Sequence, residues 1–279
     1  MSDAPDIIFR VWGSRGSIFA GGADHNTFGG DTTCFSIETD GRFLIVDAGS
    51  GLRALGQELM NREEGPPEEI DLLLTHLHID HICGLPFFAP LMSGKTKVRL
   101  WNSVYPDPET LRGALSRGLA PPIFPIDTTV WDTLEVRVPE AGVRVALGPD
   151  SMARAFPLHH PDGACGWRVN SAGRVVVIAS DHEYGNPSID AQVAYYARFA
   201  DMLVWDASYT EDELTTRRGW GHSSWNRGLK VGAKVGAASM LMTHHMPERT
   251  DAELISMERA AQALARKTMF AREGLVITL

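Results

Sequence analysis

The sequence has 279 residues, 44% of them hydrophobic, enough to bury a sizeable core in one large domain or two small ones. Its formal net charge of -9 argues against a long nucleic acid as a partner, because an acidic surface repels phosphate backbones. Three cysteines without a C-x-x-C pair, no N-terminal signal segment and no run long enough to cross a membrane argue against a disulfide framework, secretion and a membrane protein, so we expect a cytoplasmic protein.

The first third of the sequence is predicted to be rich in strands, and it ends on a cluster of histidines. A hairpin is expected around the Asp40-Gly41 pair, because Asp-Gly suits a tight turn. A short buried strand, residues 70–75, comes directly before the histidines. The elements expected here are strands at residues 7–12, 34–38, 42–46 and 70–75, and a helix at residues 52–60.

Residues 101–129 differ in character from the rest of the chain. Five prolines and several aromatic side chains surround one short helical stretch, residues 109–117. We expect an ordered excursion here rather than a flexible linker. No break in composition marks a domain boundary, so residues 1–279 are predicted to form a single domain that carries this excursion.

The second half alternates strands and helices, so two sheets packed face to face with helices outside would fit the pattern. The last long helix is amphipathic, with apolar side chains recurring on one face. Strands are expected at residues 133–138, 143–146, 152–157, 166–169, 175–179, 202–205, 239–243 and 276–279, and helices at residues 189–199, 224–235 and 251–267.

The strongest chemical signal is an H-x-H-x-D-H run made of His76, His78, Asp80 and His81. Alternate residues of an extended chain share a face, so His76 and His78 point the same way. Asp80 and His81 follow in the turn beyond, so the pattern suits one cation on each pair. Four such groups are costly to bury together unless a cation is shared between them. The run therefore predicts a site for two metal ions.

This run resembles the signature of the metallo-β-lactamase superfamily, and the resemblance extends from Val11 to His245. It implies an α/β fold arranged as a four-layer αββα sandwich. It also implies further site residues at the ends of later strands. These are His160, with His159 as the fallback; Asp181, as the carboxylate shared by both metals; His244, with His245 as the fallback; and Asp47, which orients the site from behind the ligands.

Three features resemble the branch that contains RNase Z and cyclic phosphodiesterases. Position 181 is Asp, whereas true metallo-β-lactamases commonly place a cysteine there. Residues 221–224 read Gly-His-Ser-Ser and resemble a motif whose histidine, here His222, protonates the leaving oxygen of a phosphodiester. The opening, through residues 29–34, resembles that of small bacterial members of the branch, although Asp31 replaces their usual asparagine.

The resemblance implies a metal-dependent hydrolase, most favourably a phosphodiesterase that uses a metal-bound hydroxide. Two divalent metal ions are expected, Zn²⁺ or Mn²⁺ with Fe as a further option, and the catalytic residues are Asp80, which orients the nucleophile, and His222. The long arm with which RNase Z grips tRNA has no counterpart, since the stretch from His160 to Asp181 is short and the stretch from Asp181 to His222 is not basic. We therefore expect a small phosphodiester as substrate, with cyclic phosphodiesters included. We expect no long nucleic acid and no membrane as partner, and the family suggests a homodimer.

Two alternatives remain open from the sequence. A lactone or thioester hydrolase would use the same two metals and would need an oxyanion-stabilising tyrosine, for which Tyr184 is the candidate. A non-enzymatic metal-binding sensor module is the other alternative, and the intact set of ligands argues against it.

Overall fold

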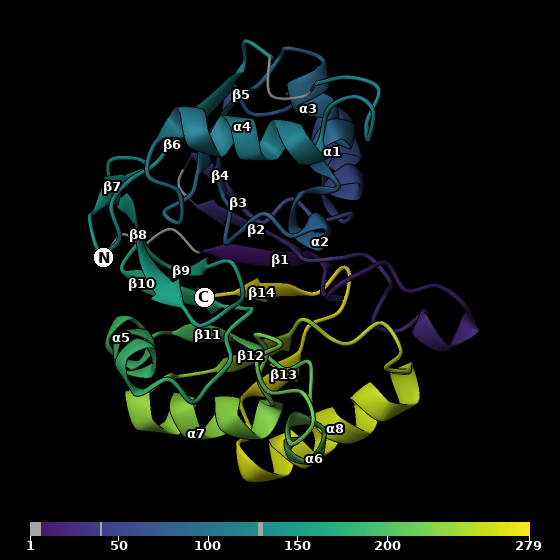
Figure 1. Ribbon diagram of the computed structural model, residues 1–279, viewed down its shortest axis with the longest axis vertical. Coiled ribbons are helices and arrows are strands. Elements are labelled where there is room, and N and C mark those ends of the chain that lie inside the picture. Colours follow the sequence, from purple (N-terminus) through teal and green to yellow (C-terminus); the bar gives the residue numbers. More distant parts are fainter. Residues whose placement is uncertain (1–6, 40, 128–130) are drawn as a thin grey trace.

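The computed structural model describes residues 7–39, 41–127 and 131–279. Asp40 of the predicted hairpin turn and residues 128–129 of the predicted excursion lie outside these ranges. Two seven-stranded sheets pack face to face, and helices cover the outer face of each (Figure 1). This arrangement confirms the predicted α/β class and the four-layer order of helices, sheet, sheet and helices.

The first sheet contains the N-terminal half of the chain and the last strand. Its strands lie in the order β14-β1-β2-β3-β4-β5-β6. Pairing is antiparallel from β14 to β3 and parallel from β3 to β6. The strands are β1 (Ile8–Gly13), β2 (Cys34–Thr39), β3 (Arg42–Val46), β4 (Glu69–Leu73), β5 (Lys97–Trp101), β6 (Leu134–Arg137) and β14 (Val276–Thr278).

The second sheet lies in the order β13-β12-β11-β10-β9-β8-β7. Its strands pair antiparallel from β7 to β10 and parallel from β10 to β13. The strands are β7 (Val145–Ala146), β8 (Ser151–Leu158), β9 (Ala164–Ser171), β10 (Arg174–Ala179), β11 (Met202–Asp206), β12 (Met240–Thr243) and β13 (Thr268–Phe270). The parallel strands of both sheets therefore end close to the histidine-bearing segments.

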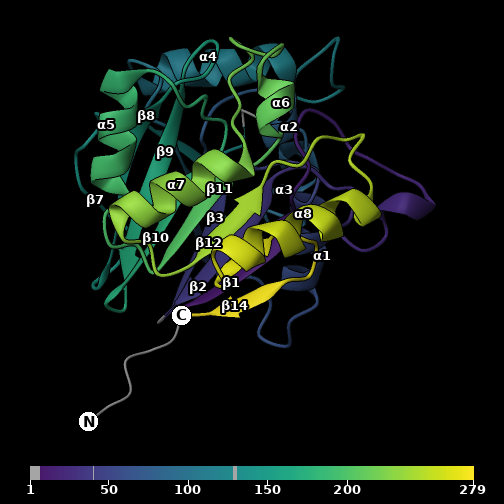
Figure 2. The ribbon, with the colours of Figure 1, turned by 90° about the horizontal axis from the view of Figure 1, so that it is seen from below.

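Helices α1, α3 and α4 cover the first sheet, and α5, α7 and α8 cover the second (Figure 2). Among the described residues, no helix combines the length and hydropathy needed to cross a membrane. The helices are η1 (Ala23–His25), α1 (Leu52–Met60), α2 (Ile79–Ile82), η2 (Leu85–Phe87), α3 (Ala89–Met92), α4 (Pro108–Gly118), α5 (Pro187–Tyr196), α6 (Glu211–Leu214), α7 (Trp225–Val235) and α8 (Asp251–Leu264).

The apolar core lies in three layers, one between the sheets and one beneath each layer of helices. Phe9, Phe35 and Trp167 are fully buried between the sheets. Trp205, on β11, is fully buried beneath α7. Burial of such large apolar side chains on both faces of each sheet stabilises the sandwich and fixes where the strand ends lie.

Local side-chain signals set where the longer helices begin. Asp107 accepts a hydrogen bond from the Thr110 N–H at the start of α4, and Ser224 accepts one from Arg227 at the start of α7. Thr250 forms a reciprocal capping box at the start of α8. These caps explain why the predicted helix starts lie within two residues of those observed.

The segment around the histidine run differs from the expectation in two places. β4 ends at Leu73 rather than at residue 75, because the Thr75 N–H donates to the Asp47 carboxylate instead of to a neighbouring strand. Asp80 and His81 were expected in a turn, but they lie on the single helical turn of α2. Both side chains are thereby directed to one side of the chain.

Two strands were not predicted, β13 at the edge of the second sheet and β5 inside the first. The predicted helix at residues 251–267 ends at Leu264, and residues 268–270 form β13, an edge strand that was not expected. β5 was not expected either, because Lys97 and Arg99 interrupt its apolar pattern.

A buried ion pair explains how a charged strand fits beside β4. Arg99 donates from Nε and Nη2 to the two Asp71 oxygens, at 2.7 and 2.6 Å, and Asp71 is only 1% exposed. Trp101 Nε1 donates to the same carboxylate at 2.8 Å. Lys97, on the same strand, instead pairs with Glu135 at 3.1 Å, where half of the lysine side chain is in solvent.

We predict that Arg99→Ala lowers the free energy of unfolding by about 3 kcal/mol, because it leaves the Asp71 carboxylate buried without its cation. Lys97→Ala, the matched control on the same strand, should change it by less than about 0.5 kcal/mol, because exposed ion pairs contribute little. Urea denaturation of the three proteins measures both values. Equal losses in the two variants would contradict the assignment.

Candidate metal centre

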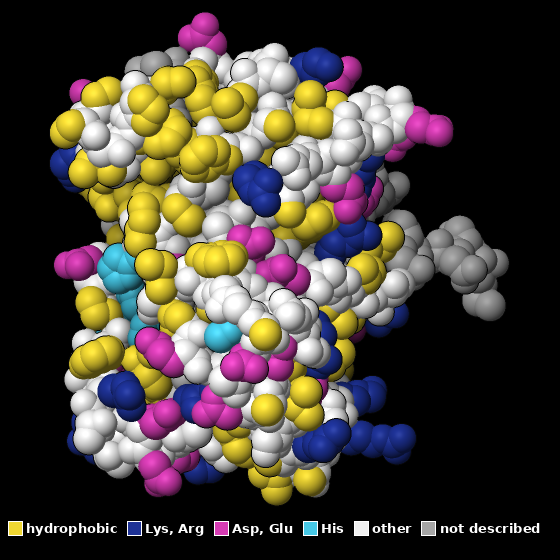
Figure 3. All heavy atoms as spheres, turned by 90° about the vertical axis from the view of Figure 1, so that its right-hand side faces the viewer, with side chains coloured by type: hydrophobic (Ala, Val, Ile, Leu, Met, Phe, Trp, Pro, Cys, Tyr) yellow, Lys and Arg dark blue, Asp and Glu magenta, His cyan; other side chains and the backbone are white. Residues whose placement is uncertain are grey.

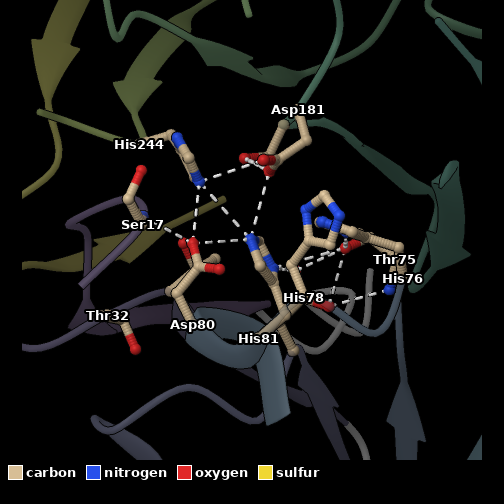
Figure 4. Close-up of polar contacts among 12 residues, drawn as sticks. Ser17, Thr32, Thr75, His76, His78, Asp80, His81, Asp181 and His244 are labelled. Atoms are coloured by element: carbon tan, nitrogen blue, oxygen red, sulfur yellow. Dashed lines mark hydrogen bonds and ion pairs between the residues drawn. The ribbon is translucent and has the colours of Figure 1, made fainter. Parts of the chain in front are cut away.

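The predicted site residues come together where strands of both sheets end (Figure 4). The H-x-H-x-D-H run follows β4 of the first sheet, and the other predicted metal ligands, His160, Asp181 and His244, follow β8, β10 and β12 of the second. Figure 4 shows Asp80, His81, Asp181 and His244 pointing toward one another. Side chains that are up to 168 positions apart in the sequence, as His76 and His244 are, therefore share one site.

The first group consists of His76, His78 and His160, whose ligand atoms lie within 4.8 Å of one another. His78 Nδ1 and His160 Nε2 are 3.1 Å apart. In two of these rings the nitrogen that faces away from the group has a hydrogen-bond partner. His76 Nδ1 contacts Thr75 Oγ1 at 3.0 Å, and His160 Nδ1 donates to the Gly221 carbonyl at 2.9 Å. This arrangement directs a lone pair of each imidazole to one point.

The second group consists of Asp80, His81 and His244. His81 Nε2 and His244 Nε2 each lie 3.2 Å from Asp80 Oδ2. His81 Nδ1 is held by Asp47 at 2.8 Å. The same Asp47 carboxylate accepts the Thr75 N–H at 2.8 Å, so it lies behind the ligands, as expected for this residue.

Asp181 lies between the two groups. Its oxygens are 3.0 Å from His244 Nε2 and 3.4 Å from His81 Nε2. It also forms a group with His76 and His81 whose ligand atoms lie within 4.8 Å of one another. Its position is therefore that of a carboxylate able to contact a cation in either group.

Three of these residues have backbone in the left-handed region. The φ angles are 61° at Asp47, 60° at Asp181 and 61° at His244, each just after a strand. A residue other than glycine rarely adopts this conformation, which costs roughly 1–3 kcal/mol. This backbone conformation turns each side chain away from the line of its strand and toward the metal centre.

The electrostatics of the site show how strongly its carboxylates favour positive charge. Burial lowers the pKa of His244, but the Asp181 and Asp80 carboxylates outweigh it and raise that pKa to about 10. Burial also opposes the charged form of His81, yet Asp80, Asp181 and Asp47 hold its pKa well above the usual range. Burial and the neighbouring His81 hold the pKa of His76 well below it. The second group thus attracts a cation, and His76 of the first presents a neutral imidazole.

The donor set fits divalent cations. His76 Nε2 is buried and has no hydrogen-bond partner, which is costly unless an ion accepts its lone pair. Imidazole nitrogens and carboxylate oxygens, with no thiolate, suit Zn²⁺, Mn²⁺ or Fe²⁺. The hydrogen bonds behind His81 and His160 fix their ring orientations, as is usual for metal-binding histidines.

The two fallback histidines lie outside both groups. His159 Nδ1 contacts the Glu183 carbonyl at 3.0 Å. His245 Nε2 contacts the Ala271 carbonyl at 3.0 Å, and burial, with nearby Arg15, lowers its pKa to about 3. The structure therefore brings His160 and His244 into the site and leaves their neighbours in structural contacts.

His222 lies beside Asp181, and its partner is an aspartate that the sequence analysis missed. His222 Nδ1 is 2.8 Å from Asp206 Oδ2, and Asp206 is fully buried. Asp206 also accepts the Asp181, Ser208 and Ser223 N–H groups. The available signal was its position at the end of an apolar strand, the same signal that identified Asp181.

An open hollow of about 280 Å³ lies over the site and is lined by His78, Asp80, Asp181, His222 and His244, together with Ser17 and Ile79. Figure 3 shows histidine side chains reaching the surface between a hydrophobic upper area and a lower area of mixed charge. Tyr184 lies elsewhere, in the wall of a separate cavity.

Comparisons with known proteins agree with this geometry. Residues 42–245 match the family described as "Beta-lactamase superfamily domain". Ribonuclease Z of Gemmatimonas aurantiaca is 23% identical over an aligned length of 297 residues. The alignment covers 88% of this chain and 90% of that protein. The metallo-beta-lactamase fold protein YhfI from Bacillus subtilis is similar in structure, with a TM-score of 0.73 and 16% identity over 99% of this chain and 100% of that one. A diphosphatase from the PhnP family gives a TM-score of 0.70 and 17% identity over 98% and 97%.

We predict that Gly221→Ala lowers stability more than Gly219→Ala, by about 1–3 kcal/mol. Both glycines have positive φ, 86° and 83°, so both variants carry the same backbone strain. A Cβ at Gly221 would lie 2.1 Å from His160 Nδ1, whereas one at Gly219 would meet nothing within 4 Å. Urea denaturation measures the difference. Equal stability of the variants would show that the Gly221 backbone does not support His160.

Proposed function

The chain belongs to the metallo-β-lactamase superfamily, and from that premise we propose that it is a dinuclear metal-dependent hydrolase of small phosphodiesters. The observation that carries the proposal is that His222 lines the same hollow as the two groups of candidate ligands. Its imidazole is held there by the buried Asp206 carboxylate. Activation of water requires only the metal ions, whereas an imidazole fixed beside them can also protonate the leaving group.

In this proposal His76, His78 and His160 hold one cation, and Asp80, His81 and His244 hold the other. Asp181 contacts both. Zn²⁺ and Mn²⁺ are the proposed metals, and Fe²⁺ would fit the same donors. Such cations, when bound, lower the pKa of water and neutralise charge on a phosphate.

The proposed role of His222 is to protonate the leaving oxygen. Its Nδ1 donates to Asp206, so Nε2 is the nitrogen that remains for the substrate. An alkoxide is a poor leaving group unless it receives a proton, which makes a positioned imidazole useful in the cleavage of a phosphodiester. Asp206 acts as a positioning residue, because its contacts with three backbone N–H groups fix the orientation of the imidazole.

Asp80 and Asp47 have separate proposed roles. Asp80 Oδ2 accepts the Ser17 N–H at 2.7 Å, so the carboxylate is fixed at the floor of the hollow, where it can orient the attacking water. Asp47 contacts no part of the hollow and acts through His81 and Thr75. Its expected contribution is to metal affinity rather than to the chemical step.

The position of Tyr184 favours a phosphodiester over a lactone or thioester. A tyrosine that stabilises an oxyanion must reach the hollow, and Tyr184 lines a different cavity. The curated relative from Gemmatimonas aurantiaca is a ribonuclease Z, and a structural relative is a diphosphatase, so phosphorus–oxygen chemistry is common among proteins of this fold.

The size of the hollow supports a small substrate. Its volume is about 280 Å³. Between Asp181 and His222 the chain folds into α5, β11 and α6 against the second sheet, with no long arm among the described residues that could grip a nucleic acid. We propose a nucleotide-sized phosphodiester, with cyclic phosphates included.

The metal assignment predicts different outcomes for adjacent histidines. His160→Ala should lower the metal content of the purified protein from two equivalents to about one, because it removes one of three ligands of the first group. His159→Ala should keep both, since the His159 side chain contacts the Glu183 carbonyl and lines the separate cavity. Elemental analysis after dialysis gives the metal content, and equal content in the two variants would refute the assignment.

The catalytic assignment predicts that the metal-loaded protein hydrolyses bis(p-nitrophenyl) phosphate and 2′,3′-cyclic nucleotides. His222→Ala should lower kcat by about 10²–10⁴-fold for the cyclic nucleotide, whose alkoxide leaving group needs a proton, and much less for bis(p-nitrophenyl) phosphate, whose p-nitrophenolate does not, with unchanged metal content. Asp206→Asn should lower kcat by about 10–100-fold, because the imidazole loses its fixed orientation. His25→Ala, in η1, which does not line the hollow, is the control and should keep full activity. No turnover by a fully metallated protein would refute the phosphodiesterase proposal and direct the search to lactones and thioesters.

A further inference from the structure

A cavity of about 610 Å³ lies on the far side of the backbone that carries His160. His159 lines this cavity, whereas His160 belongs to the first group of the metal centre. Since successive side chains of an extended chain point to opposite sides, the cavity and the metal centre are separated by little more than one backbone.

The same wall is strengthened by hydrogen bonds. Glu183 lines the cavity and accepts the N–H groups of Gly219 and Gly221, at 2.8–2.9 Å. The Gly221 carbonyl in turn accepts from His160 Nδ1. The cavity and the metal centre therefore share a rigid boundary, so a ligand bound in one has a fixed position relative to the other.

The cavity concentrates positive charge in an acidic protein. Arg227, Lys230 and Lys234 recur at helical spacing on one face of α7, and Arg218 joins them from the loop before it. Four cations thus line a cavity that contains two carboxylates, Glu183 and Glu211, whereas the whole chain has a net charge of -9. Two of the five lysines of the chain lie here.

Most of this positive charge is not used by the fold. Arg227 is held in place, because its Nη1 donates to the Tyr184 carbonyl at 2.8 Å and its Nε contacts Glu211 at 3.3 Å. Within the described residues, Arg218, Lys230 and Lys234 form no ion pair. These three side chains are exposed and line one cavity, so an anion bound between them would meet several positive charges at once.

We propose that this cavity binds a second phosphate group of the substrate whose phosphodiester is cleaved at the metal centre. Arginine and lysine bind phosphate through charge-assisted hydrogen bonds. Leu214, Val231 and Tyr184 also line the cavity, so the part of the substrate that carries the second phosphate can pack against apolar side chains. The inference rests on the proposed function, because it assigns a second group of the same substrate.

Lysine labelling tests the anion site without any turnover. Pyridoxal 5′-phosphate, a phosphate-bearing aldehyde, is reduced onto lysines of the metal-loaded protein with borohydride, and the labelled residues are mapped by mass spectrometry. Lys230 and Lys234 should be labelled at least about tenfold faster than Lys95, Lys97 and Lys267, and inorganic phosphate should protect them. Equal labelling of all five lysines, unaffected by phosphate, would overturn the proposal.

Kinetics test whether the anion belongs to the substrate. Thymidine 5′-(p-nitrophenyl phosphate) is compared with the same ester that carries a 3′-phosphate, and with one whose 3′-phosphate is joined to a second nucleoside. The second and third compounds distinguish a terminal phosphate from an internal one. We expect kcat/KM to be about tenfold higher for a compound with the second phosphate.

The pocket variant combines Arg218→Ala, Lys230→Ala and Lys234→Ala. Its matched control combines Arg53→Ala, Lys95→Ala and Lys267→Ala, which removes three positive charges from surface outside the cavity. The advantage of the second phosphate should disappear in the pocket variant and persist in the control, while bis(p-nitrophenyl) phosphate is hydrolysed equally by both. The same kcat/KM for all three thymidine esters in the parent protein would overturn the assignment to a substrate. If the parent hydrolyses no ester, the proposed function fails, and the labelling result still accepts or rejects the anion site.

Discussion

The two sheets are joined by hydrogen bonds to the two residues that immediately precede the histidine run, and the site depends on this contact. Trp167 Nε1, on β9 of the second sheet, donates to the Leu74 carbonyl at 3.1 Å, and the Cys165 N–H donates to the Thr75 carbonyl at 3.0 Å. Both acceptors follow β4 of the first sheet. Because these bonds are buried, a shift of one sheet against the other would leave them unsatisfied. They therefore fix the distance across which residues of one sheet meet residues of the other, and a metal centre needs that distance held to a few tenths of an ångström.

Features encoded by neighbouring residues were predictable. The H-x-H-x-D-H run, the apolar strands before it and the helix predicted at residues 224–235 are local patterns, and the structure has these elements within two residues of the predicted bounds. The run predicted one cation on each pair of ligands. In the structure His76 and His78 group with His160, and Asp80 and His81 group with His244, while His76 and His81 also share a group with Asp181. The pairing of ligands with metals therefore stays a prediction, drawn from the backbone period that sets the direction of side chains near a strand end.

Features set by contacts distant in sequence were not predictable. Nothing local distinguishes His159 from His160, because the choice depends on the Gly221 carbonyl, 61 residues away, which holds one of the two rings. Asp206 ends an apolar strand, as Asp181 does, but its pairing with His222 was not predictable, because the two residues are brought together only by folding. β5 was missed because Arg99 reads as exposed until Asp71 is placed beside it.

The overall charge was the least informative quantity. The stretch between Asp181 and His222 was described as not basic, yet Arg218 lies in it and meets three cations of α7 only after folding. A net charge averages over the surface, whereas a ligand responds to the local field within about one Debye length, roughly 8–10 Å.

An acidic exterior around a basic cavity also has a consequence for selectivity. Long polyanions are repelled by the exterior, and a small anion that fits the cavity is attracted once it is inside. The acidic total and the basic cavity therefore favour the same class of substrate, a small molecule with more than one phosphate.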